Sequence, residues 1–307
     1  MDFVSLRYFV EVVRQRNVTK AAALLNVAQP AVTRRMHQLE ESFGVPLLMR
    51  RRHGVIPTEA GTIVFERAER VLRLAGEMQN DVLSRTAEPA GQLRFGFPPS
   101  VGNVFAVSLV SDFLRRFPRV SVQLHEHFSP AMREALIGGR IDMGIMSCEA
   151  AHPDLHYEPL FQEGLWLIGL AADWPFRRTG MLELRRLVDK PLLLASLLRL
   201  TLERTGAEKG LSFNVRLEAD ALTTVCEAVR RGVGFLVGPP SSVSREIGRG
   251  EFVGAPIRGL RVTRGLYRHR DRPVTQALRE LTDATRAEAG RLLRDHPKMF
   301  QPVAVAA

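Results

Sequence analysis

The spacing of apolar residues changes near Pro89, and this change does most to limit the folds open to the chain. Before Pro89, apolar residues recur mainly at helical spacing. After it, short apolar runs such as QLRFGF alternate with helical stretches such as VFAVSLVSDFLRRFP. Strands that alternate with helices specify a parallel sheet. We therefore expect a largely helical N-terminal region followed by an α/β region.

Three short helices are predicted at the N-terminus. The first has a buried stripe that consists of Leu6, Phe9, Val10 and Val13. The second begins at a cap, Asn17 or Thr19, and ends at Asn26. The third spans AQPAVTRRMHQLEESFG, and its inward stripe consists of Val32, Met36 and Leu39.

The opposite face of the third helix carries hydrogen-bonding side chains near its N-terminus. These residues are Gln29, Pro30, Thr33, Arg34 and His37. A proline in the first turn starts a helix sharply, and glutamine and arginine can pair with adenine and guanine in the major groove. The face therefore suits a recognition helix, although from this helix alone an ordinary polar face is an equal alternative.

The stretch PLLMRRRHGVIPTEAG, which follows the third helix, favours the interpretation of that helix as a recognition helix over an ordinary polar face. It contains two short apolar runs around a basic turn that ends in Gly54. This pattern predicts a two-stranded wing whose tip offers cations to DNA phosphates. The residues of the tip are Arg50, Arg51, Arg52 and His53.

The net charge of +10 favours an anionic partner. Residues 1–58 carry nine cationic and four anionic side chains, and so hold half of the excess. The other half lies mainly toward the C-terminus, where we interpret the arginines as a solvated face. They include Arg258, Arg261, Arg264, Arg268, Arg270 and Arg272.

A long helix is predicted from Thr58, a candidate N-cap, to the polar stretch SRTAEPAGQ, which is typical of a hinge. Its apolar residues follow a heptad spacing that favours pairing with a second copy of the helix. Packing on its own domain is the alternative. The stripe consists of Val64, Ala68, Val71, Ala75, Met78 and Val82.

The α/β pattern after the hinge occurs twice, once before residue 163 and again between residues 163 and 267. The second half contains GLWLIGLAA, KPLLLAS, NVRLEAD, ALTTVCEAVRRG and VGFLVGP. Two such halves leave a cleft, and ligands of open α/β sheets bind at the carboxyl ends of the strands.

The N-terminus has no signal-peptide core and the chain has no apolar run of roughly 20 residues, so we expect a soluble, cytoplasmic protein without a membrane partner. Cys148 and Cys226 are too few for a disulfide framework or a thiolate zinc site, and both are interpreted as core thiols. No metal or cofactor is expected.

The stretch NVTKAAALLNVAQPAVTRRMHQLEESFGVPLLMRRRHGVIPTEAG resembles the DNA-binding domain of LysR-type transcriptional regulators. GQLRFGF, LIGGRIDMGIM and AVRRGVGFLVGPP resemble landmarks of the effector domain of that family. AQPA, LLMR and PTEAG look most like the subgroup that contains the nitrogen assimilation control protein.

The resemblance implies a winged helix-turn-helix domain (1–58), a linker helix for dimerisation (59–87) and an α/β effector domain (88–307). The effector domain would resemble periplasmic binding proteins, with subdomain I at about 92–162 and 268–300 and subdomain II at about 163–267. Such proteins are sequence-specific DNA-binding regulators rather than enzymes, and they respond to small molecules. They form homodimers or homotetramers on an interrupted palindromic operator in double-stranded DNA, and activators among them also contact RNA polymerase.

The resemblance places Gln29, Pro30, Thr33 and Arg34 in the major groove, with Arg34 the best candidate for a base contact. Its matching effector positions are Ser100, Val101, Ser129, Ser147 and Ser196. These hydroxyls and the nearby helix N-termini can hold a carboxylate, although a lone serine is more often a turn or cap residue.

Two residues depart from the family pattern. Ala28 stands where many members have a capping serine or threonine before the recognition helix, so a cap worth about 1 kcal/mol is absent or replaced. Ser147 stands where some carboxylate-sensing members have arginine, which weakens the expectation of a dianionic aromatic effector.

Three other functions are poorly supported by the sequence. An enzyme would need a catalytic motif, yet no GKS/T loop, GxSxG elbow or HExxH helix is present. A solute-binding protein would need a signal peptide and would not explain the basic N-terminal segment. A redox-sensing regulator would need basic or histidine neighbours that activate Cys148 or Cys226.

Overall fold

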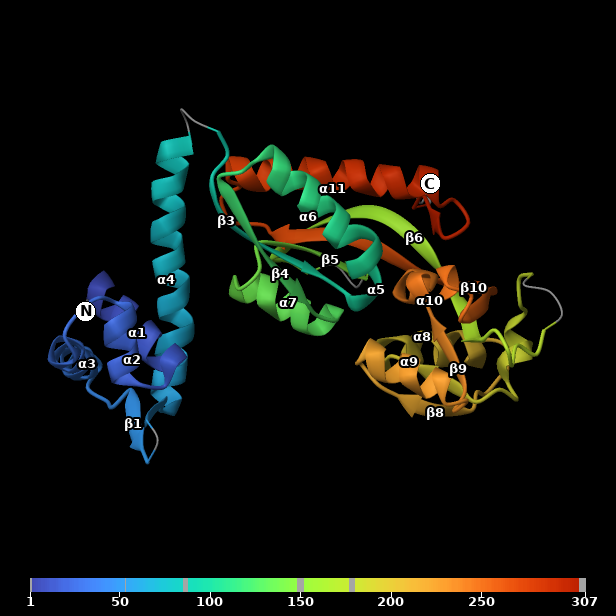
Figure 1. Cartoon of the computed structure of the whole chain (residues 1–307), viewed down its shortest axis with the longest axis horizontal. Helices are drawn as coiled ribbons and strands as arrows, with labels where there is room; N and C mark the ends of the chain where they lie inside the picture. Colours follow the sequence, from blue (N-terminus) through green and yellow to red (C-terminus); the bar gives the residue numbers. More distant parts are fainter. Residues whose placement is uncertain (1, 53, 85–87, 148–151, 177–179, 304–307) are drawn as a thin grey trace. The chain divides into compact units, whose positions relative to one another are not determined.

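The computed structural model describes residues 2–52, 54–84, 88–147, 152–176 and 180–303 (Figure 1). The chain divides into two compact units, Met1–Ala87 and Glu88–Ala307, which we call unit 1 and unit 2. Among the described residues, no helix combines the length and the apolar character that crossing a membrane requires.

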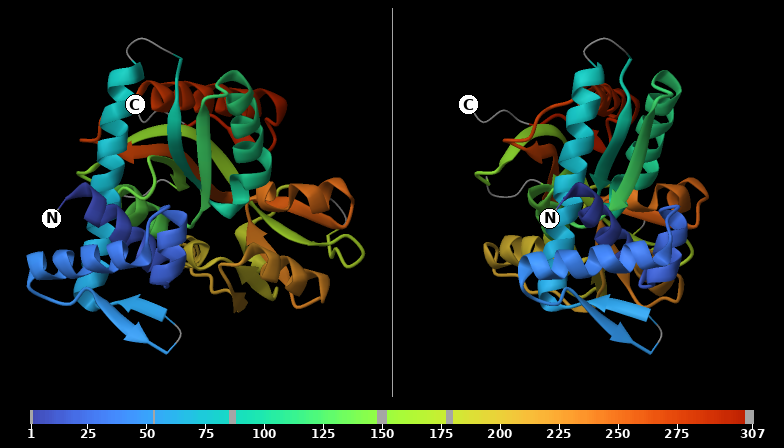
Figure 2. Two further views of the ribbon diagram at one scale, coloured as in Figure 1. Left: turned by 60° about the vertical axis from the view of Figure 1, so that its left-hand side comes forward. Right: turned by 90° about the vertical axis from the view of Figure 1, so that its left-hand side faces the viewer.

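Unit 1 consists of helices and a two-stranded hairpin. Its elements are α1 (Phe3–Gln15), α2 (Val18–Leu24), α3 (Gln29–Phe43), β1 (Leu48–Arg51), β2 (Gly54–Pro57) and α4 (Glu59–Ser84). The hairpin lies beside α3 at one end of the unit in both views of Figure 2.

Side-chain caps define where the helices of unit 1 begin. Asn17 Oδ1 accepts a hydrogen bond from the Lys20 amide at 3.0 Å, and Thr58 Oγ1 accepts one from the Gly61 amide at 2.9 Å. Ala28 provides no such bond at the start of α3, where Pro30 occupies the first turn. The predicted caps at Asn17 and Thr58 are confirmed, as is the missing cap at Ala28.

The core of unit 1 lies between α1, α3 and α4. The predicted inward residues of α3, Val32, Met36 and Leu39, are all buried there. Val64 and Ala68 of α4 belong to the same core. The dimerisation stripe predicted for α4 is therefore wrong at these two positions, because side chains enclosed by their own unit cannot contact a partner helix.

The hairpin requires a glycine where it meets α1. Gly54 has a φ of +138°, and a Cβ atom there would lie 2.1 Å from the carbonyl oxygen of Arg16. The neighbouring Val55 amide donates a hydrogen bond to that same carbonyl at 2.9 Å. Only glycine permits this close approach, which joins the wing to the end of α1.

Unit 2 contains one mixed sheet with helices around it. Its strands are β3 (Gly91–Phe97), β4 (Val120–Glu126), β5 (Met143–Ser147), β6 (Leu155–Leu170), β7 (Leu192–Leu194), β8 (Val215–Glu218), β9 (Phe235–Gly238), β10 (Phe252–His269) and β11 (Phe300–Gln301). Its α-helices are α5 (Pro99–Val101), α6 (Val107–Arg116), α7 (Ser129–Gly138), α8 (Ser196–Ala207), α9 (Leu222–Arg230), α10 (Ser244–Gly248) and α11 (Gln276–Asp295). A π-helical turn (Gly102–Ala106) and two 3₁₀ turns (Leu184–Leu187 and Pro240–Val243) complete it.

The strands follow the order β4-β3-β5-β10-β6-β9-β7-β8, and β11 pairs with β6. The β3, β4 and β5 strands are parallel to one another, as are β7, β8 and β9, but β6 and β10 run antiparallel to their neighbours. The predicted parallel pairing is therefore found within each half, and the sheet as a whole is mixed because of β6 and β10. The β10 strand lies between β5 and β6, the β6 strand lies between β10 and β9, and each of these neighbouring pairs is antiparallel.

Unit 2 buries separate apolar cores toward the two ends of these long strands. One core gathers Phe95, Phe105 and Leu281 with their neighbours, and the other gathers Leu165, Leu192 and Val237 with theirs. The β6 and β10 strands run along both parts of the unit (Figure 1). The boundaries predicted near residues 163 and 268 fall inside these two strands.

Candidate nucleic-acid interface and ligand pocket

The outer face of α3 gathers the residues predicted to contact bases. Gln29, Pro30, Arg34 and His37 are exposed, and Thr33 is half-buried. All five line one open surface depression together with Gln38 and Glu41. The face opposite the core of unit 1 is therefore polar, continuous and accessible, as insertion into a groove of DNA requires.

Two adjacent arginines of α3 differ in their surroundings. Arg35 donates to the Asp2 carboxylate at 2.6 Å, and Asp2 in turn caps α1 by accepting from the Ser5 amide at 2.7 Å. Arg34 has no ion-pair or hydrogen-bond partner in the part of the chain that the structure describes. Arg35 therefore stabilises unit 1, whereas the guanidinium of Arg34 is available to an external acceptor.

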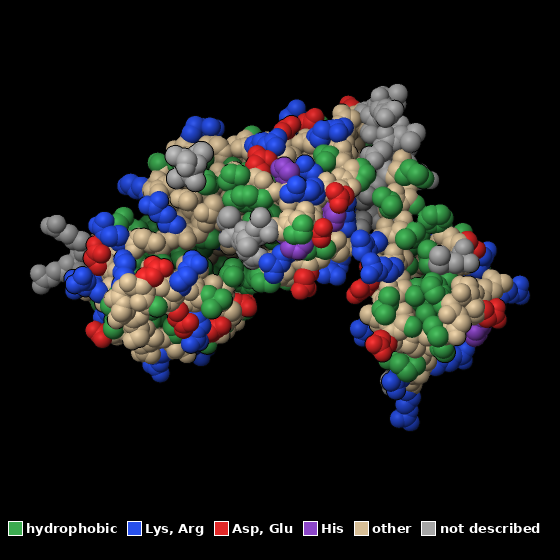
Figure 3. Space-filling view, turned by 180° about the vertical axis from the view of Figure 1, so that it is seen from behind, with side chains coloured by type: hydrophobic (Ala, Val, Ile, Leu, Met, Phe, Trp, Pro, Cys, Tyr) green, Lys and Arg blue, Asp and Glu red, His purple; other side chains and the backbone are tan. Residues whose placement is uncertain are grey.

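The wing is fixed to α3 by Glu40. Its Oε1 atom accepts hydrogen bonds from the amides of Leu47 and Leu48 at 2.8 and 3.0 Å. Arg50, Arg51 and Arg52 are exposed on the hairpin, and basic side chains gather at that end of unit 1 (Figure 3). His53 lies outside the described residues. The recognition face and the basic tip therefore share one rigid support.

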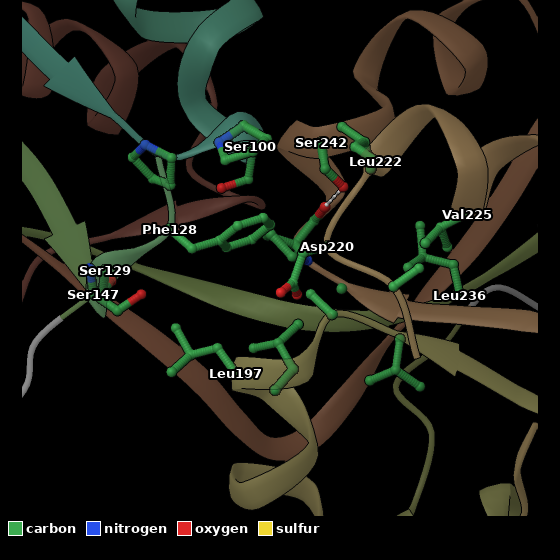
Figure 4. Close-up of a pocket in the computed structure, with 18 of the residues that line it drawn as sticks. Ser100, Phe128, Ser129, Ser147, Leu197, Asp220, Leu222, Val225, Leu236 and Ser242 are labelled. Carbon is green, nitrogen blue, oxygen red and sulfur yellow. Dashed lines mark hydrogen bonds between the residues drawn. The ribbon is translucent and has the colours of Figure 1, made fainter. Parts of the chain in front are cut away.

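A pocket in unit 2 lies at the carboxyl ends of the parallel strands. One wall comes from the residues that follow β3, β4 and β5, and the other comes from those that follow β7, β8 and β9 (Figure 4). Open α/β sheets bind ligands at these ends. Ser100, Ser129 and Ser147, three of the five predicted effector residues, line this pocket.

Arg264 supplies the positive charge of the first wall. It is 5% exposed, and its Nη1 and Nη2 atoms donate hydrogen bonds to the hydroxyls of Ser147 and Ser100 at 2.7 and 2.8 Å. Ser129 is tied to the same group because its hydroxyl accepts from the Ser147 amide at 3.2 Å. Ser100 and Ser147 therefore position Arg264 by hydrogen bonds, and Ser129 joins the same hydrogen-bonded group.

Glu163 lies behind Arg264 and is completely buried. Its Oε1 atom accepts from the Ser241 amide at 3.2 Å, and its Oε2 atom lies 3.9 Å from Arg264 Nη2, beyond hydrogen-bonding distance. Burial raises the pKa of Glu163, and the nearby Arg264 charge only partly opposes this effect. The glutamate therefore gives Arg264 incomplete charge compensation.

Asp220 supplies the negative charge of the second wall. Its Oδ1 atom accepts from the Ser196 amide at 3.0 Å, at the first residue of α8. The side chain is exposed and lines the pocket, and Figure 4 shows its carboxylate directed toward the interior. The helix N-terminus that was expected to hold an effector carboxylate is thus already occupied by a carboxylate of the protein.

Comparison with protein families gives a match for each of the two units. Residues 3–62 match the family described as the bacterial regulatory helix-turn-helix protein, LysR family, and residues 86–290 match the LysR substrate binding domain. The second match alone covers more than half of the chain.

The chain belongs to the LysR family of transcriptional regulators.

Curated members of the LysR family resemble this chain along most of its length. The transcriptional regulator TdcA of Escherichia coli is 30% identical over 262 residues, which cover 81% of this chain and 80% of TdcA. The nitrogen assimilation regulatory protein nac of Escherichia coli is 28% identical over 246 residues, or 79% of each chain, which agrees with the predicted subgroup. Both relatives are named as regulators and not as enzymes.

The fold agrees with a solved LysR-family structure. Full-length CbnR in complex with its target DNA has a TM-score of 0.74 and is 23% identical to this chain, with coverage of 94% of this chain and all of CbnR. This likeness supports the predicted fold, a winged helix-turn-helix and long helix followed by an α/β domain.

Two of the five predicted effector positions, Val101 and Ser196, are not among the residues that line this pocket. Val101 is fully buried in the core around β3 and is not among the residues that line the pocket. Ser196 also lies outside the lining, and its hydroxyl instead helps to lower the pKa of Glu218. Val101 ends the short helix α5 and Ser196 begins α8, so the direction of each side chain follows from its helix and not from its place after a strand.

Arg264 and Asp220 were missed by the sequence reasoning. Arg264 was interpreted as part of a solvated face, and this interpretation is wrong because β10 is covered on both sides at that position. Arg258, Arg261 and Arg270 of the same group are indeed exposed. A sequence signal existed, because Arg264 follows the buried Val262 by two residues and therefore points to the same face of the strand.

The thiol of Cys226 is buried, and this burial raises its pKa to about 11. A reactive cysteine needs a depressed pKa, so Cys226 is a core thiol as predicted and does not support a redox sensor. Cys148 lies outside the described residues. Among the described residues, no three His, Cys, Asp or Glu side chains are grouped so that they could hold a metal ion.

Proposed function

We propose that this LysR-type regulator recognises an operator through the outer face of α3, with Arg34 as the principal base contact. The observation that carries this proposal is the exposed and unpaired state of Arg34 among the described residues, next to an Arg35 that is tied to Asp2. Gln29 and Thr33 support it because they are joined by a hydrogen bond of 3.0 Å on the same face. The exposed wing residues Arg50 and Arg52 are proposed to contact phosphates.

We propose further that the protein pairs through the exposed part of α4. Val71 and Met78 of the predicted stripe are 42% and 63% exposed, and Ala75 is half-buried, while the side chain of Val82 lies outside the described residues. A two-fold homodimer, or a homotetramer of such dimers, would read an interrupted palindrome in double-stranded DNA. Activation would add contacts to RNA polymerase in the cytoplasm.

The pocket of unit 2 is proposed to bind a small-molecule effector. Its place at the carboxyl ends of six strands and its buried Arg264 support this role. An effector that binds two arrangements of the protein with different affinity can shift DNA binding by about 5-fold to 150-fold. The predicted hinge after α4 would transmit the change to unit 1.

The test compares Arg34→Ala with Arg35→Ala in the full-length protein. Binding is measured over a salt series to DNA from the upstream region of the gene and to a scrambled fragment. Wild type should prefer the native fragment by roughly 1,000-fold or more. Arg34→Ala should reduce that preference by about 1–3 kcal/mol.

The matched control separates base recognition from folding. Arg35→Ala should leave the preference unchanged and lower the melting temperature, because it removes the contact with Asp2. Equal loss of preference in both variants would contradict the assignment of Arg34. Equal binding of wild type to both fragments would contradict sequence-specific recognition of that upstream DNA.

A further inference from the structure

Arg264 is a buried cation that the described residues compensate only in part. Its two serine partners are neutral, and its Nε atom has no hydrogen-bond partner in the described part of the chain. Each terminal nitrogen carries two N–H groups, and each uses one of them for a serine. The guanidinium therefore retains donors at the wall of the pocket.

Glu163 compensates the charge of Arg264 only in part. Its Oε2 atom is buried without a hydrogen-bond partner among the described residues and lies 3.9 Å from Arg264 Nη2. Burial raises the pKa of this carboxyl group, and no hydrogen bond joins it to Arg264, so the positive charge of Arg264 is compensated only in part. An anion in the pocket would relieve the cost of burying that charge.

The second wall of the pocket, which contains Asp220, disfavours a second negative charge on the ligand. Among the described residues Asp220 has no ion-pair partner, and its one hydrogen bond engages only Oδ1. Its second carboxylate oxygen, Oδ2, therefore has no hydrogen-bond partner among the described residues. A ligand group that approaches this wall meets repulsion if it is anionic and attraction if it is cationic.

The surface between the two charged walls is apolar. Phe128 extends from the side of Ser129, and Leu197 and Leu222 extend from the side of Asp220 (Figure 4). Val225 and Leu236 continue the lining. A ligand that fits must therefore combine an apolar body with a charge at one end.

We propose that the pocket selects small apolar monocarboxylates, whose carboxylate is bound by Arg264, and that Asp220 excludes dicarboxylates. This inference rests on the proposed effector role of the pocket and adds the chemical class of the effector. An amine at the end opposite the carboxylate is compatible with Asp220. The expected ligand class thus differs from dianionic effectors.

Calorimetric titration of the full-length protein with matched probes tests the proposal. The probes are hexanoate, benzoate and cyclohexanecarboxylate, each with its neutral amide and with the corresponding dicarboxylate adipate, terephthalate or cyclohexane-1,4-dicarboxylate. At least one monocarboxylate should bind roughly tenfold or more tightly than both its amide and its dicarboxylate, because it alone gains the charged hydrogen bond without the repulsion.

Two variants assign the preference to residues. Arg264→Gln should abolish the preference for acid over amide. Asp220→Asn retains the Oδ1 acceptor for the Ser196 amide and removes the charge, so it should improve dicarboxylate binding roughly tenfold and leave amide binding unchanged. The Asp220 variant changes an exposed side chain, and it remains decisive if Arg264→Gln does not fold.

Three outcomes would overturn the proposal: acids that bind no better than their amides, acid preference that survives Arg264→Gln, or dicarboxylate discrimination that survives Asp220→Asn. Operator binding is measured on the same samples. If a monocarboxylate binds but operator binding does not change, the proposed regulatory role of the pocket is contradicted. The proposed ligand class is then still supported. If the protein without a probe does not bind the operator, the proposed DNA-binding role of α3 and the wing is contradicted instead.

Discussion

Glu163 illustrates how burial changes the behaviour of a single residue. Its carboxyl group is fully enclosed beside Arg264, and the pKa is raised chiefly by desolvation. Glu158, five residues earlier on β6, has a lowered pKa because Arg286 donates to both of its carboxylate oxygens at 2.7 Å. One strand therefore carries two glutamates with opposite expected effects of pH on stability.

The Glu163→Gln variant should become more stable than wild type as the pH rises. A carboxyl group whose pKa is raised by folding stabilises the protein at low pH, and this contribution is lost as the pH rises through its folded-state pKa. We expect the two proteins to melt alike below the ordinary glutamate pKa, with a difference of a few degrees near neutral pH, since about 1 kcal/mol corresponds to roughly 2–4 °C. Fluorescence of Trp166 and Trp174, both in unit 2, measures the transition.

Glu158→Gln is the control for this measurement. A lowered pKa stabilises the folded state above the unfolded-state pKa, so this variant should lose stability relative to wild type as the pH rises from acid to neutral. Melting curves for Glu163→Gln that remain parallel to wild type over the whole pH range would contradict a perturbed Glu163.

The α4 helix has two apolar surfaces, of which one is buried in unit 1 and the other is exposed. Val64 and Ala68 complete the core of unit 1. A second set remains exposed, with exposed fractions between 42% and 63%, and it consists of Ile63, Val71, Leu74 and Met78. Exposed apolar side chains that recur along one helix are typical of an interface.

Replacement of Leu74 with glutamate should weaken self-association of the full-length protein without unfolding unit 1. The physical reason is that a charge would have to be buried between paired helices. Sedimentation velocity over a concentration series measures the association. Val64→Ala is the matched control, because it should cost roughly 2 kcal/mol of stability and leave the oligomeric state unchanged. A Leu74→Glu protein that sediments like wild type would contradict pairing through this surface.

At the scale of the whole molecule, the net charge of +10 predicts binding to DNA that weakens with salt. The exposed arginines of the wing provide a local source of phosphate contacts, whereas those of unit 2, such as Arg261, add to the net charge alone. Charge at the interface and charge elsewhere should therefore affect the salt dependence differently.

Arg50→Ala and Arg52→Ala should each reduce the slope of log K against log salt by about 1. Neither variant should change the preference for the native fragment over the scrambled one, because phosphate contacts carry no base sequence. Arg261→Ala removes the same charge from unit 2 and should leave the slope unchanged. An equal effect of all three variants would mean that net charge, and not contact, governs affinity.

Local patterns predicted the parts of the molecule that depend on neighbours in the sequence. The inward stripe of α3, the caps at Asn17 and Thr58, and the strand and helix alternation of unit 2 all follow from periodicity and from hydrogen bonds within a few residues. Ser100, Ser129 and Ser147 could be assigned to the pocket because each follows or ends a parallel strand.

Other features depended on contacts between distant segments. The heptad stripe of α4 looks the same whether its partner is a second copy or the core of unit 1, and only the fold assigned Val64 and Ala68 to the core. Arg264 belongs to a run of arginines, and its burial results from pairing of β10 with both β5 and β6. The sequence by itself determined the class of each element and the face that carries the recognition residues, because these depend on short-range periodicity. Only the tertiary structure decided which charges face the pocket, because burial and ion pairing are set by residues as far apart as Ser100 and Arg264.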